Sequence, residues 1–435
     1  MTTLITHIRL LAGLHQRSTV LRGAELAVLP SLEDAFLLIE DGVITAFGAM
    51  YELELVVPHL PKDILDATGQ YVLPAWCDSH THLVFARSRE EEFIDKIKGM
   101  SYAEIAAKGG GILNSARRLN ESSEDELFNS AWERLQNLVK LGTGAIEIKS
   151  GYGLTVEGEL KMLRVIKKLK EKSPVPVKAS FLGAHTYPLE YKENHQGYIN
   201  SIIHEMLPVI GGEKLADYID VFCETGFFSP EEMETICRAG MQYGLKPKLH
   251  VNQLNSIGGI EAAIRLNAIS VDHLETMTEN DIKLLSDSQA PIGTMLPTAA
   301  FFLRMPFQPA RQLIDAGCAV ALASDFNPGS SPSGNMNFVL ALSCIQMKML
   351  PEEAINAATL NGAFAMELDG VAGSITIGKK ANLIFTKPIP SLAYLPYAFS
   401  PVIYAHCLKF FFQCFRVFRK IISKPFPFFG KATDN

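Results

Sequence analysis

Eight short apolar runs recur through the middle of the chain, with amphipathic stretches of helical length in the gaps. The first run ends just before His80, and the others are Gly144–Ile148, Ala179–Ala184, Tyr218–Phe222, Lys246–Leu249, Ala268–Val271, Ala290–Leu296 and Ala319–Ser324. The segments Glu124–Leu141 and Val156–Lys172 have helical spacing. Eight strand-then-helix units over about 275 residues are typical of a (β/α)8 TIM-like barrel, an α/β fold. A doubly wound open sheet is the alternative that strand counting leaves open.

The two ends of the chain carry strand-like runs of a different kind. Two runs near the N-terminus flank the pair Asp41–Gly42, which is typical of a tight hairpin. A similar run returns at Gly373–Phe385. We therefore expect the ends to fold together as a small β-sandwich. The predicted division is residues 1–70 and 366–405 for the sandwich, 71–365 for the barrel, and 406–435 for a separate tail.

Composition narrows the class of protein. The 435 residues are 48% hydrophobic and 20% charged, which suits a large core and argues against a disordered chain. A net charge of −7 argues against a nucleic-acid partner. The seven cysteines form no C-x-x-C pair, and the N-terminus lacks the layout of a signal peptide, so we expect a cytoplasmic protein.

The tail from Cys407 onward is basic and rich in phenylalanine. Such a composition is compatible with an amphipathic helix on a membrane surface. The aromatic residues are irregularly spaced and Pro425 and Pro427 interrupt them, so membrane attachment is not favoured.

Polar side chains stand where the apolar runs end. They are His80, His82, His185, His250, His273 and Asp325. In a barrel the C-terminal ends of all strands meet on one face, so residues far apart in sequence share a site. One His-x-His pair is weak evidence, but five of eleven histidines at strand ends are not readily assigned to chance. Imidazole and carboxylate ligands suit zinc or iron.

Longer motifs surround these residues and resemble those of the imidazolonepropionase family of the amidohydrolase superfamily. The motifs are Asp78–Phe93, Gly109–Leu113, Glu147–Leu154, Phe181–His185, Lys248–His250, Val271–Leu274 and Ser324–Ser331. The His-x-His motif marks only the superfamily. Lys-Ser-Gly-Tyr-Gly at 149–153 and Asn-Pro-Gly-Ser-Ser at 327–331 are far more specific. The likeness runs from about residue 35 to residue 385.

The resemblance implies a barrel with a β-sandwich from both chain ends, and a homodimer. It also implies hydrolytic ring opening of 4-imidazolone-5-propanoate, a small carboxylate substrate, to N-formimidoyl-L-glutamate in histidine degradation. One zinc or iron ion per subunit is then expected on His80, His82, His250 and Asp325. The fourth strand-like run is followed by no lysine of the kind that bridges two metals in related enzymes, which favours a single ion.

The resemblance also suggests roles around the ion. Asp325 is expected to move protons between the attacking water and the leaving nitrogen, and His273 to stabilise the charge that develops on oxygen. Some family members have Glu where this chain has Gln253, and a glutamine can only orient by hydrogen bonding. The residues expected to bind the substrate are Arg89, Tyr152, His185, Asn327, Gly329 and Ser330.

Two other functions remain open at this point. One is a different cyclic amidohydrolase, or an aminohydrolase, of the same superfamily. The other is a metal-binding scaffold without catalysis. Arg89, Tyr152 and the Asn-Pro-Gly-Ser block at 327–330 favour the imidazolonepropionase interpretation over another amidohydrolase, because a guanidinium can grip a substrate carboxylate with two hydrogen bonds. The intact ligand set, with Asp325 and His273, argues against a scaffold without catalysis.

Overall fold

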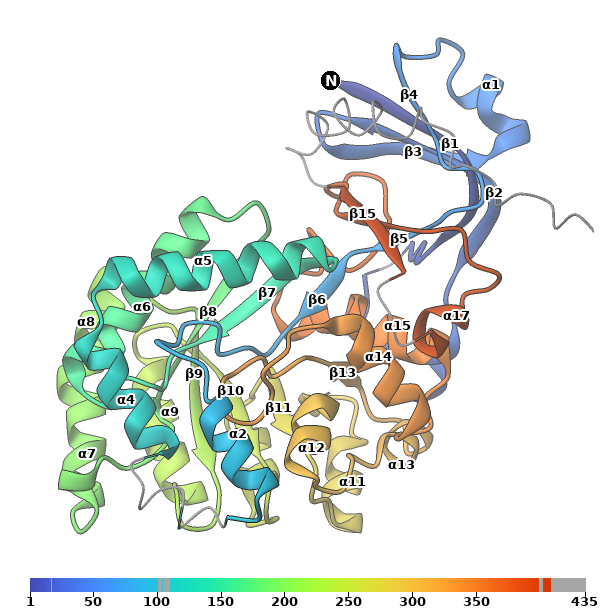
Figure 1. Cartoon of the computed structure of the whole chain (residues 1–435). Coiled ribbons are helices and arrows are strands. Elements are labelled where there is room, and N and C mark those ends of the chain that lie inside the picture. Colours follow the sequence, from blue (N-terminus) through green and yellow to red (C-terminus); the bar gives the residue numbers. More distant parts are fainter. Residues whose placement is uncertain (17, 101–103, 105–109, 399–401, 408–435) are drawn as a thin grey trace, which may run out of the picture.

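The computed structural model describes residues 1–16, 18–100, 104, 110–398 and 402–407, and the predicted 406–435 tail therefore lies almost entirely outside the described residues. Its centre is a parallel eight-stranded sheet in which neighbouring strands follow chain order, with helices between them (Figure 1). The strands are β6 (Trp76–Asp78), β7 (Thr143–Lys149), β8 (Val177–Ala184), β9 (Tyr218–Cys223), β10 (Lys246–Val251), β11 (Ser270–His273), β12 (Ile292–Met295) and β13 (Val320–Leu322). Each predicted apolar run coincides with one of these strands, and the predicted α/β barrel is confirmed.

The barrel closes just beyond the ends of its first and last strands. Thr81 and Phe326 form a parallel bridge, and the His82 N–H donates to the Phe326 carbonyl at 2.9 Å. The buried carboxylate of Asp78 ties the same two segments by accepting from the N–H (2.9 Å) and hydroxyl (2.6 Å) of Ser324. These contacts between the segments after the first and last strands, which we call the barrel seam, therefore lie directly beside the predicted metal ligands.

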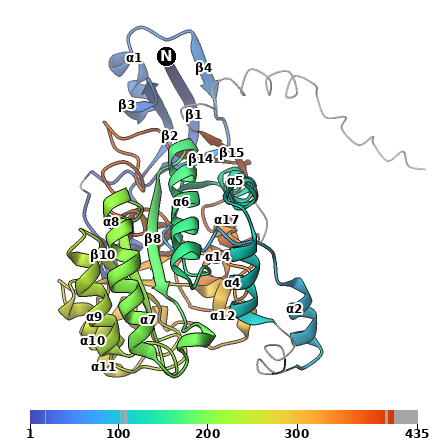
Figure 2. The ribbon, with the colours of Figure 1, turned by 90° about the vertical axis from the view of Figure 1, so that its left-hand side faces the viewer.

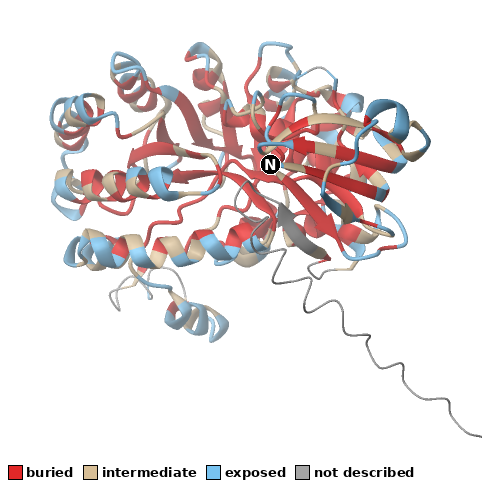
Figure 3. Ribbon diagram, turned by 90° about the horizontal axis from the view of Figure 1, so that it is seen from above, coloured by how far each residue is buried: buried red, intermediate tan, exposed pale blue. Residues whose placement is uncertain are grey.

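Helices surround the strands, with buried strands at the centre and partly exposed helices outside (Figure 3). The helices of the barrel region are α2 (Glu90–Ile97), α4 (Gly111–Glu121), α5 (Glu124–Lys140), α6 (Val156–Lys172), α7 (His195–Ser201), α8 (Leu207–Glu213), α9 (Pro230–Met241), α10 (Gly259–Arg265), α11 (Glu279–Leu285), α12 (Pro297–Leu303), α13 (Ala310–Asp315), α14 (Met336–Ile345), α15 (Pro351–Ala358) and α16 (Leu360–Ala365). Helix α5 begins after a capping box, in which the Ser123 hydroxyl accepts from the Glu126 N–H and Glu126 reaches back. Helices α5 and α6 occupy the two segments predicted from helical spacing.

The two chain ends form a separate seven-stranded sheet beside the barrel (Figures 1 and 2). Its strands are β1 (Thr2–Ala12), β2 (Ser31–Glu40), β3 (Val43–Ala49), β4 (Asp63–Asp66), β5 (Tyr71–Pro74), β14 (Leu383–Thr386) and β15 (Ile403–Cys407), with α1 (Leu53–Val56) and α17 (Tyr394–Tyr397) nearby. Asp41 and Gly42 both have positive φ, 50° and 80°, as the predicted tight turn between β2 and β3 requires. The expected separate domain from both ends is confirmed.

The chain crosses from this sheet to the barrel between Pro74, which ends β5, and Trp76, which begins β6. At the crossing, the Ala75 N–H donates to the Asn382 carbonyl at 3.0 Å, and the Asn382 side chain donates to the Gly144 carbonyl at 2.6 Å. Short 3-10 turns occur at Gly23–Ala27, Met50–Glu52 and Leu189–Tyr191, and a π turn at Ile202–Met206. Among the residues described, no helix has the length and apolar character needed to cross a membrane.

Candidate metal centre and active site

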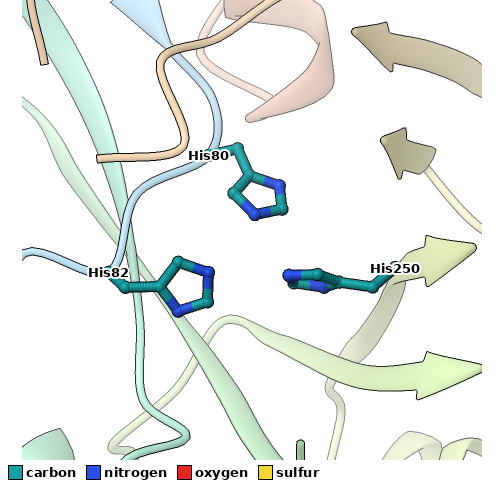
Figure 4. A group of neighbouring side chains, drawn as sticks. All are labelled: His80, His82 and His250. Carbon is teal, nitrogen blue, oxygen red and sulfur yellow. The ribbon is translucent and has the colours of Figure 1, made fainter. Parts of the chain in front are cut away.

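Three buried histidines meet at the C-terminal ends of the barrel strands. His80 and His82 follow β6 and His250 lies near the end of β10, and each offers a ring nitrogen within 4.8 Å of the other two (Figure 4). Oδ1 of Asp325, which follows β13, lies 3.5 Å from Nε2 of His80 and 3.6 Å from Nε2 of His82. The four residues expected to bind a metal are therefore brought together.

The chemistry of this group fits a divalent metal ion. Nε2 of His80 and Oδ1 of Asp325 are buried and have no hydrogen-bond partner among the described residues. Buried polar atoms are costly unless something satisfies them, and a cation does so here without a proton. Burial lowers the pKa of His80, His82 and His250 well below its usual range, which keeps these rings neutral, the state that binds metals.

Carboxylates from other strands lie against two of the histidine rings. Nδ1 of His80 lies 2.7 Å from Oδ2 of Asp272, and Nδ1 of His250 lies 2.8 Å from Oδ2 of Asp220. All four side chains are buried. The His80 pair is a hydrogen bond, and a carboxylate on the far ring nitrogen fixes the tautomer and orientation of a histidine ligand. Asp220 makes a close contact with the His250 ring and accepts a hydrogen bond from the His250 backbone N–H at 3.1 Å.

The backbone is strained at two of the site residues. Asp325 has φ of 51° and His273 has φ of 94°, in the region that residues with a side chain rarely adopt. Such conformations persist where the surrounding structure imposes them, and they occur often at active sites. The seam imposes that of Asp325, because the Asp325 N–H donates to the His80 carbonyl at 3.0 Å.

His273 lies beside the three-histidine group, with its ring centroid 5.2 Å from that of His250. Its Nδ1 is 3.3 Å from the buried carboxylate of Glu275. Burial alone would lower the pKa of His273, but Glu275, with Asp325 and Asp272, raises it above its ordinary value. A protonated or hydrogen-bond-donating imidazole at this point is suited to stabilise an oxyanion.

Asp325 is a buried carboxyl group whose pKa is raised. Burial raises the pKa of its carboxyl to about 7, while His273, Asn327 and Ser330 act in the opposite direction. The Ser330 hydroxyl donates to Oδ2 at 3.2 Å. A metal ion would counter this rise and lower the pKa of Asp325, since a cation favours the carboxylate form.

The predicted carboxylate receptor, Arg89, lines a cavity of about 560 Å³ that also includes Tyr152. Its Nε and Nη2 both donate to Glu92, whose other oxygen accepts from the Gly111 N–H at 2.9 Å. Nη1 instead lies against Gly329, where an added Cβ would come within 2.4 Å of it. Arg89 is therefore held by a neighbour on its own helix rather than left in solvent.

Tyr152 and His185 are also brought to the centre. The rings of His185 and His82 are stacked with their centroids 5.6 Å apart, and the ring centroids of Tyr152 and His185 are 5.7 Å apart. His185 Nδ1 is 2.9 Å from the Gly151 carbonyl. The buried Glu159 carboxylate shapes this loop by accepting from three N–H groups, those of Gly151, Gly153 and Leu154.

The loop after β13 is organised by Asn327. Its side chain donates to the Asp325 carbonyl and the Ser330 hydroxyl, both at 2.7 Å, and accepts from the N–H groups of Gly329 and Ser330. Gln253, two residues beyond β10, is half-buried, and its backbone carbonyl accepts from Thr276 Oγ1 at 3.4 Å. Contacts of these residues with a substrate stay predictions.

The residues that the sequence analysis did not single out are Glu92, Asp220, Asp272 and Glu275. Asp220 and Asp272 are charged residues inside apolar strands, a pattern that marks an inward-facing polar group. Glu275 follows His273 by two residues, and Glu92 follows Arg89 by three, which is one helical turn.

Similar proteins were found by sequence. The amidohydrolase family model matches residues 71–404. An imidazolonepropionase of Flavobacterium johnsoniae is 59% identical over 401 residues, which is 92% of this chain and 96% of the relative. An imidazolonepropionase of Clostridium tetani is 43% identical over 375 residues, covering 86% and 89% of the two chains.

Solved structures agree on the fold. The chain is similar to an Escherichia coli guanine deaminase, with a TM-score of 0.67 and 15% identity over 94% of this chain and 98% of that one. It is also similar to a Xanthomonas campestris adenosine deaminase with bound zinc, with a TM-score of 0.61 and 16% identity over 94% and 91%. At these identities the likeness establishes the barrel architecture and no activity.

The sequence relatives extend over nearly the whole chain and over nearly their own whole length, so they bear on both domains at once. The chain belongs to the amidohydrolase family and, within it, to the imidazolonepropionases.

Proposed function

We propose that this chain opens the ring of 4-imidazolone-5-propanoate with water to give N-formimidoyl-L-glutamate, as a metal-dependent hydrolase. The observation that carries the proposal is the convergence of His80, His82, His250 and Asp325 at one end of the barrel. Relatives that carry the name imidazolonepropionase at up to 59% identity support the choice of substrate.

One zinc or iron ion per subunit is the proposed cofactor, held by those four residues. When bound, such an ion lowers the pKa of a coordinated water toward ~7 and polarises a carbonyl group. Neutral histidines and a carboxylate suit both metals. The β9 strand, fourth in the barrel, ends at Cys223, and the next residue, Glu224, is occupied in accepting from the Leu254 and Asn255 N–H groups, which supports a single ion.

Proton transfer is assigned to Asp325. Its Oδ2 accepts from the Ser330 hydroxyl, while Oδ1 faces His80 and His82, so the carboxylate is fixed beside the position where a metal ion held by these residues would bind an attacking water. It takes a proton from water and delivers it to the ring nitrogen that leaves. His273, oriented by Glu275, donates a hydrogen bond to the oxygen on which negative charge develops.

Substrate binding is assigned to the cavity beside the metal centre. Arg89 grips the propanoate group, with Tyr152, which lines the same cavity, and His185 as further polar contacts. Gly329, against Nη1 of Arg89, and Ser330, bonded to Asp325, are assigned to the same binding site. Asn327 shapes that loop, and Gln253 orients the ring by hydrogen bonding. A guanidinium that is already held in place by Glu92 loses little conformational entropy on binding a carboxylate.

The direct test is to incubate the purified protein with freshly prepared 4-imidazolone-5-propanoate and follow loss of the ring absorbance, with metal content measured in parallel. We expect turnover that a chelator abolishes and that zinc or iron restores. Guanine and adenosine serve as control substrates, since the structural neighbours are deaminases. Failure to turn over the imidazolone with metal restored would overturn the proposal, and turnover of a purine would favour an aminohydrolase.

Three further assignments accompany the function. We propose a homodimer, which light scattering of the purified protein tests. A cytoplasmic location is supported by the free cysteines among the described residues, four of them buried. The domain boundaries after residues 70, 365 and 405 are also a proposal, although β5 extends the terminal sheet to Pro74.

A further inference from the structure

Lys149 ends strand β7, and its side chain is completely buried beneath the three-histidine group. Its Nζ lies 2.7 Å from Oε1 of Glu147, 2.8 Å from Oδ2 of Asp220 and 3.4 Å from Oδ2 of Asp272. One ammonium group thus contacts three carboxylates in the interior of the barrel. Burial alone would lower the pKa of Lys149, but these three carboxylates raise it above its usual value.

Two of those carboxylates are the ones that hold the histidine rings. The same Oδ2 atom of Asp272 contacts Lys149 and Nδ1 of His80, and the same Oδ2 atom of Asp220 contacts Lys149 and Nδ1 of His250. One buried route from one ring to the other therefore runs through a single nitrogen, Nζ of Lys149. Every contact along it is buried, where such interactions are least screened by solvent.

We propose that Lys149 is a positioning residue of the metal centre, whose ammonium group joins Asp220 to Asp272 and so fixes His80 and His250 relative to each other. It touches neither ring itself. The inference rests on the proposed metal-dependent function. It differs from that function in assigning the geometry of the site to a residue that binds neither metal nor substrate.

A role as a direct or bridging metal ligand does not fit Lys149. A lysine that binds metals must lose its proton or carry an added carboxylate group, and Nζ of Lys149 is already surrounded by three acidic side chains. Without the ammonium, Asp220, Asp272 and Glu147 would face one another in a buried space. Such an arrangement repels, and the carboxylates would move apart or take up protons.

A second buried lysine offers a matched control. Nζ of Lys248, on β10, lies 3.1 Å from Oε2 of Glu147, 2.7 Å from Ser270 Oγ and 2.9 Å from the Ala365 carbonyl. Among the described residues it forms no ion pair with Asp272 and is linked to it by Ser270, whose hydroxyl donates to Oδ1 at 2.6 Å, although the charge of Lys248 also lowers the pKa of Asp272. Lys248 therefore resembles Lys149 in burial and charge, but it does not join Asp220 to Asp272.

The test compares Lys149→Met with Lys248→Met in the full-length protein. Zinc affinity is measured by chelator competition, and the visible absorption spectrum of the cobalt(II)-loaded protein reports ligand geometry. We expect Lys149→Met to weaken zinc binding by up to about 10- to 100-fold, the usual effect of losing an outer partner of a ligand, because Asp220 and Asp272 would no longer be held against the rings. We also expect the cobalt spectrum to change in Lys149→Met and to remain close to wild type in Lys248→Met.

Unfolding of the metal-free proteins separates positioning from general stability. Both variants lose a buried charge and are expected to unfold more easily, so equal losses of zinc affinity would overturn the proposal, as would an unchanged cobalt spectrum in Lys149→Met. If Lys149→Met does not fold, Lys149→Gln keeps a donor of similar length and is read in the same way. Wild type that binds no zinc or iron would instead contradict the proposed function.

Discussion

The backbone N–H of Asp325 donates to the carbonyl of His80 at 3.0 Å, so the last strand of the barrel joins the first at two proposed metal ligands. This bond belongs to the seam that also contains Asp78 and Ser324. The contacts that close the barrel are thus also contacts that place the proposed metal ligands. A substitution at the barrel seam is therefore expected to change both the free energy of unfolding and the affinity for metal.

Ser324→Ala tests that link. It removes the hydroxyl that donates to Asp78 at 2.6 Å in a buried position. Losing a hydrogen bond to a buried carboxylate is expected to lower the free energy of unfolding by about 1–3 kcal/mol and to weaken zinc binding as well. Urea unfolding and chelator competition measure the two effects. Ser343→Ala, in a buried helix position where the hydroxyl donates to the Val339 carbonyl, should leave zinc affinity unchanged.

Asp325→Asn tests proton transfer. The amide keeps the shape of the side chain but has no basic oxygen, so kcat is expected to fall by about 10²–10⁴-fold. Metal content must be measured on the same preparation, because Asp325 is also a proposed ligand. Near-normal turnover with metal bound would remove Asp325 from the proton-transfer role.

Gly329→Ala tests the placement of Arg89. The new methyl group would lie within 2.4 Å of Arg89 Nη1, and the end of a flexible side chain moves more readily than backbone. We expect KM to rise about 10-fold or more while the melting temperature changes little. Gly212→Ala, on helix α8 with no atom within 4 Å of its added Cβ, is the matched control and should leave KM unaltered. An unchanged KM in Gly329→Ala would argue against carboxylate binding by Arg89.

The lowered pKa of His185 predicts that the folded protein loses stability in acid. Burial lowers its pKa to about 4, whereas the unfolded chain has the ordinary value near 6.5. As pH falls from about 6.5 to 4, the unfolded state takes up a proton that the folded state does not, so the free energy of unfolding falls. Between pH 7 and pH 5 the loss from this group is about 2 kcal/mol.

Urea unfolding of the metal-free protein at these two pH values measures that loss. His185→Gln removes the titrating group and should show a smaller difference between the two pH values. Because His80, His82 and His250 also have lowered pKa values, some dependence will remain in the variant. A difference that is the same in both proteins would contradict the prediction.

The sequence predicted the barrel and its histidines because both depend on local patterns. Strand ends are visible as polar residues after apolar runs, and parallel strands in a barrel bring those ends together. Helix α6 covers the predicted segment because its apolar spacing lies within it and its threonine cap, Thr155, comes immediately before it. These features need no knowledge of which strand lies beside which.

The supporting residues could not be predicted in the same way. Asp220 on β9 lies beside the His250 ring because β9 and β10 are neighbours, whereas Asp272 on β11 meets the His80 ring, which follows the non-adjacent strand β6. The division near residue 70 shows a similar limit, since β5 belongs to the terminal sheet through its pairing with β1 and with β14. Pairing over such separations is set by the whole fold rather than by any local segment.

The terminal sheet has a consequence for synthesis on the ribosome. Strand β5 pairs with β14, which is made only after the entire barrel, so the edge of β5 stays open while the barrel forms. An unpaired strand edge is a template for association with other chains. The nascent protein is therefore most exposed to misassociation late in translation, until its last strands emerge and cover that edge.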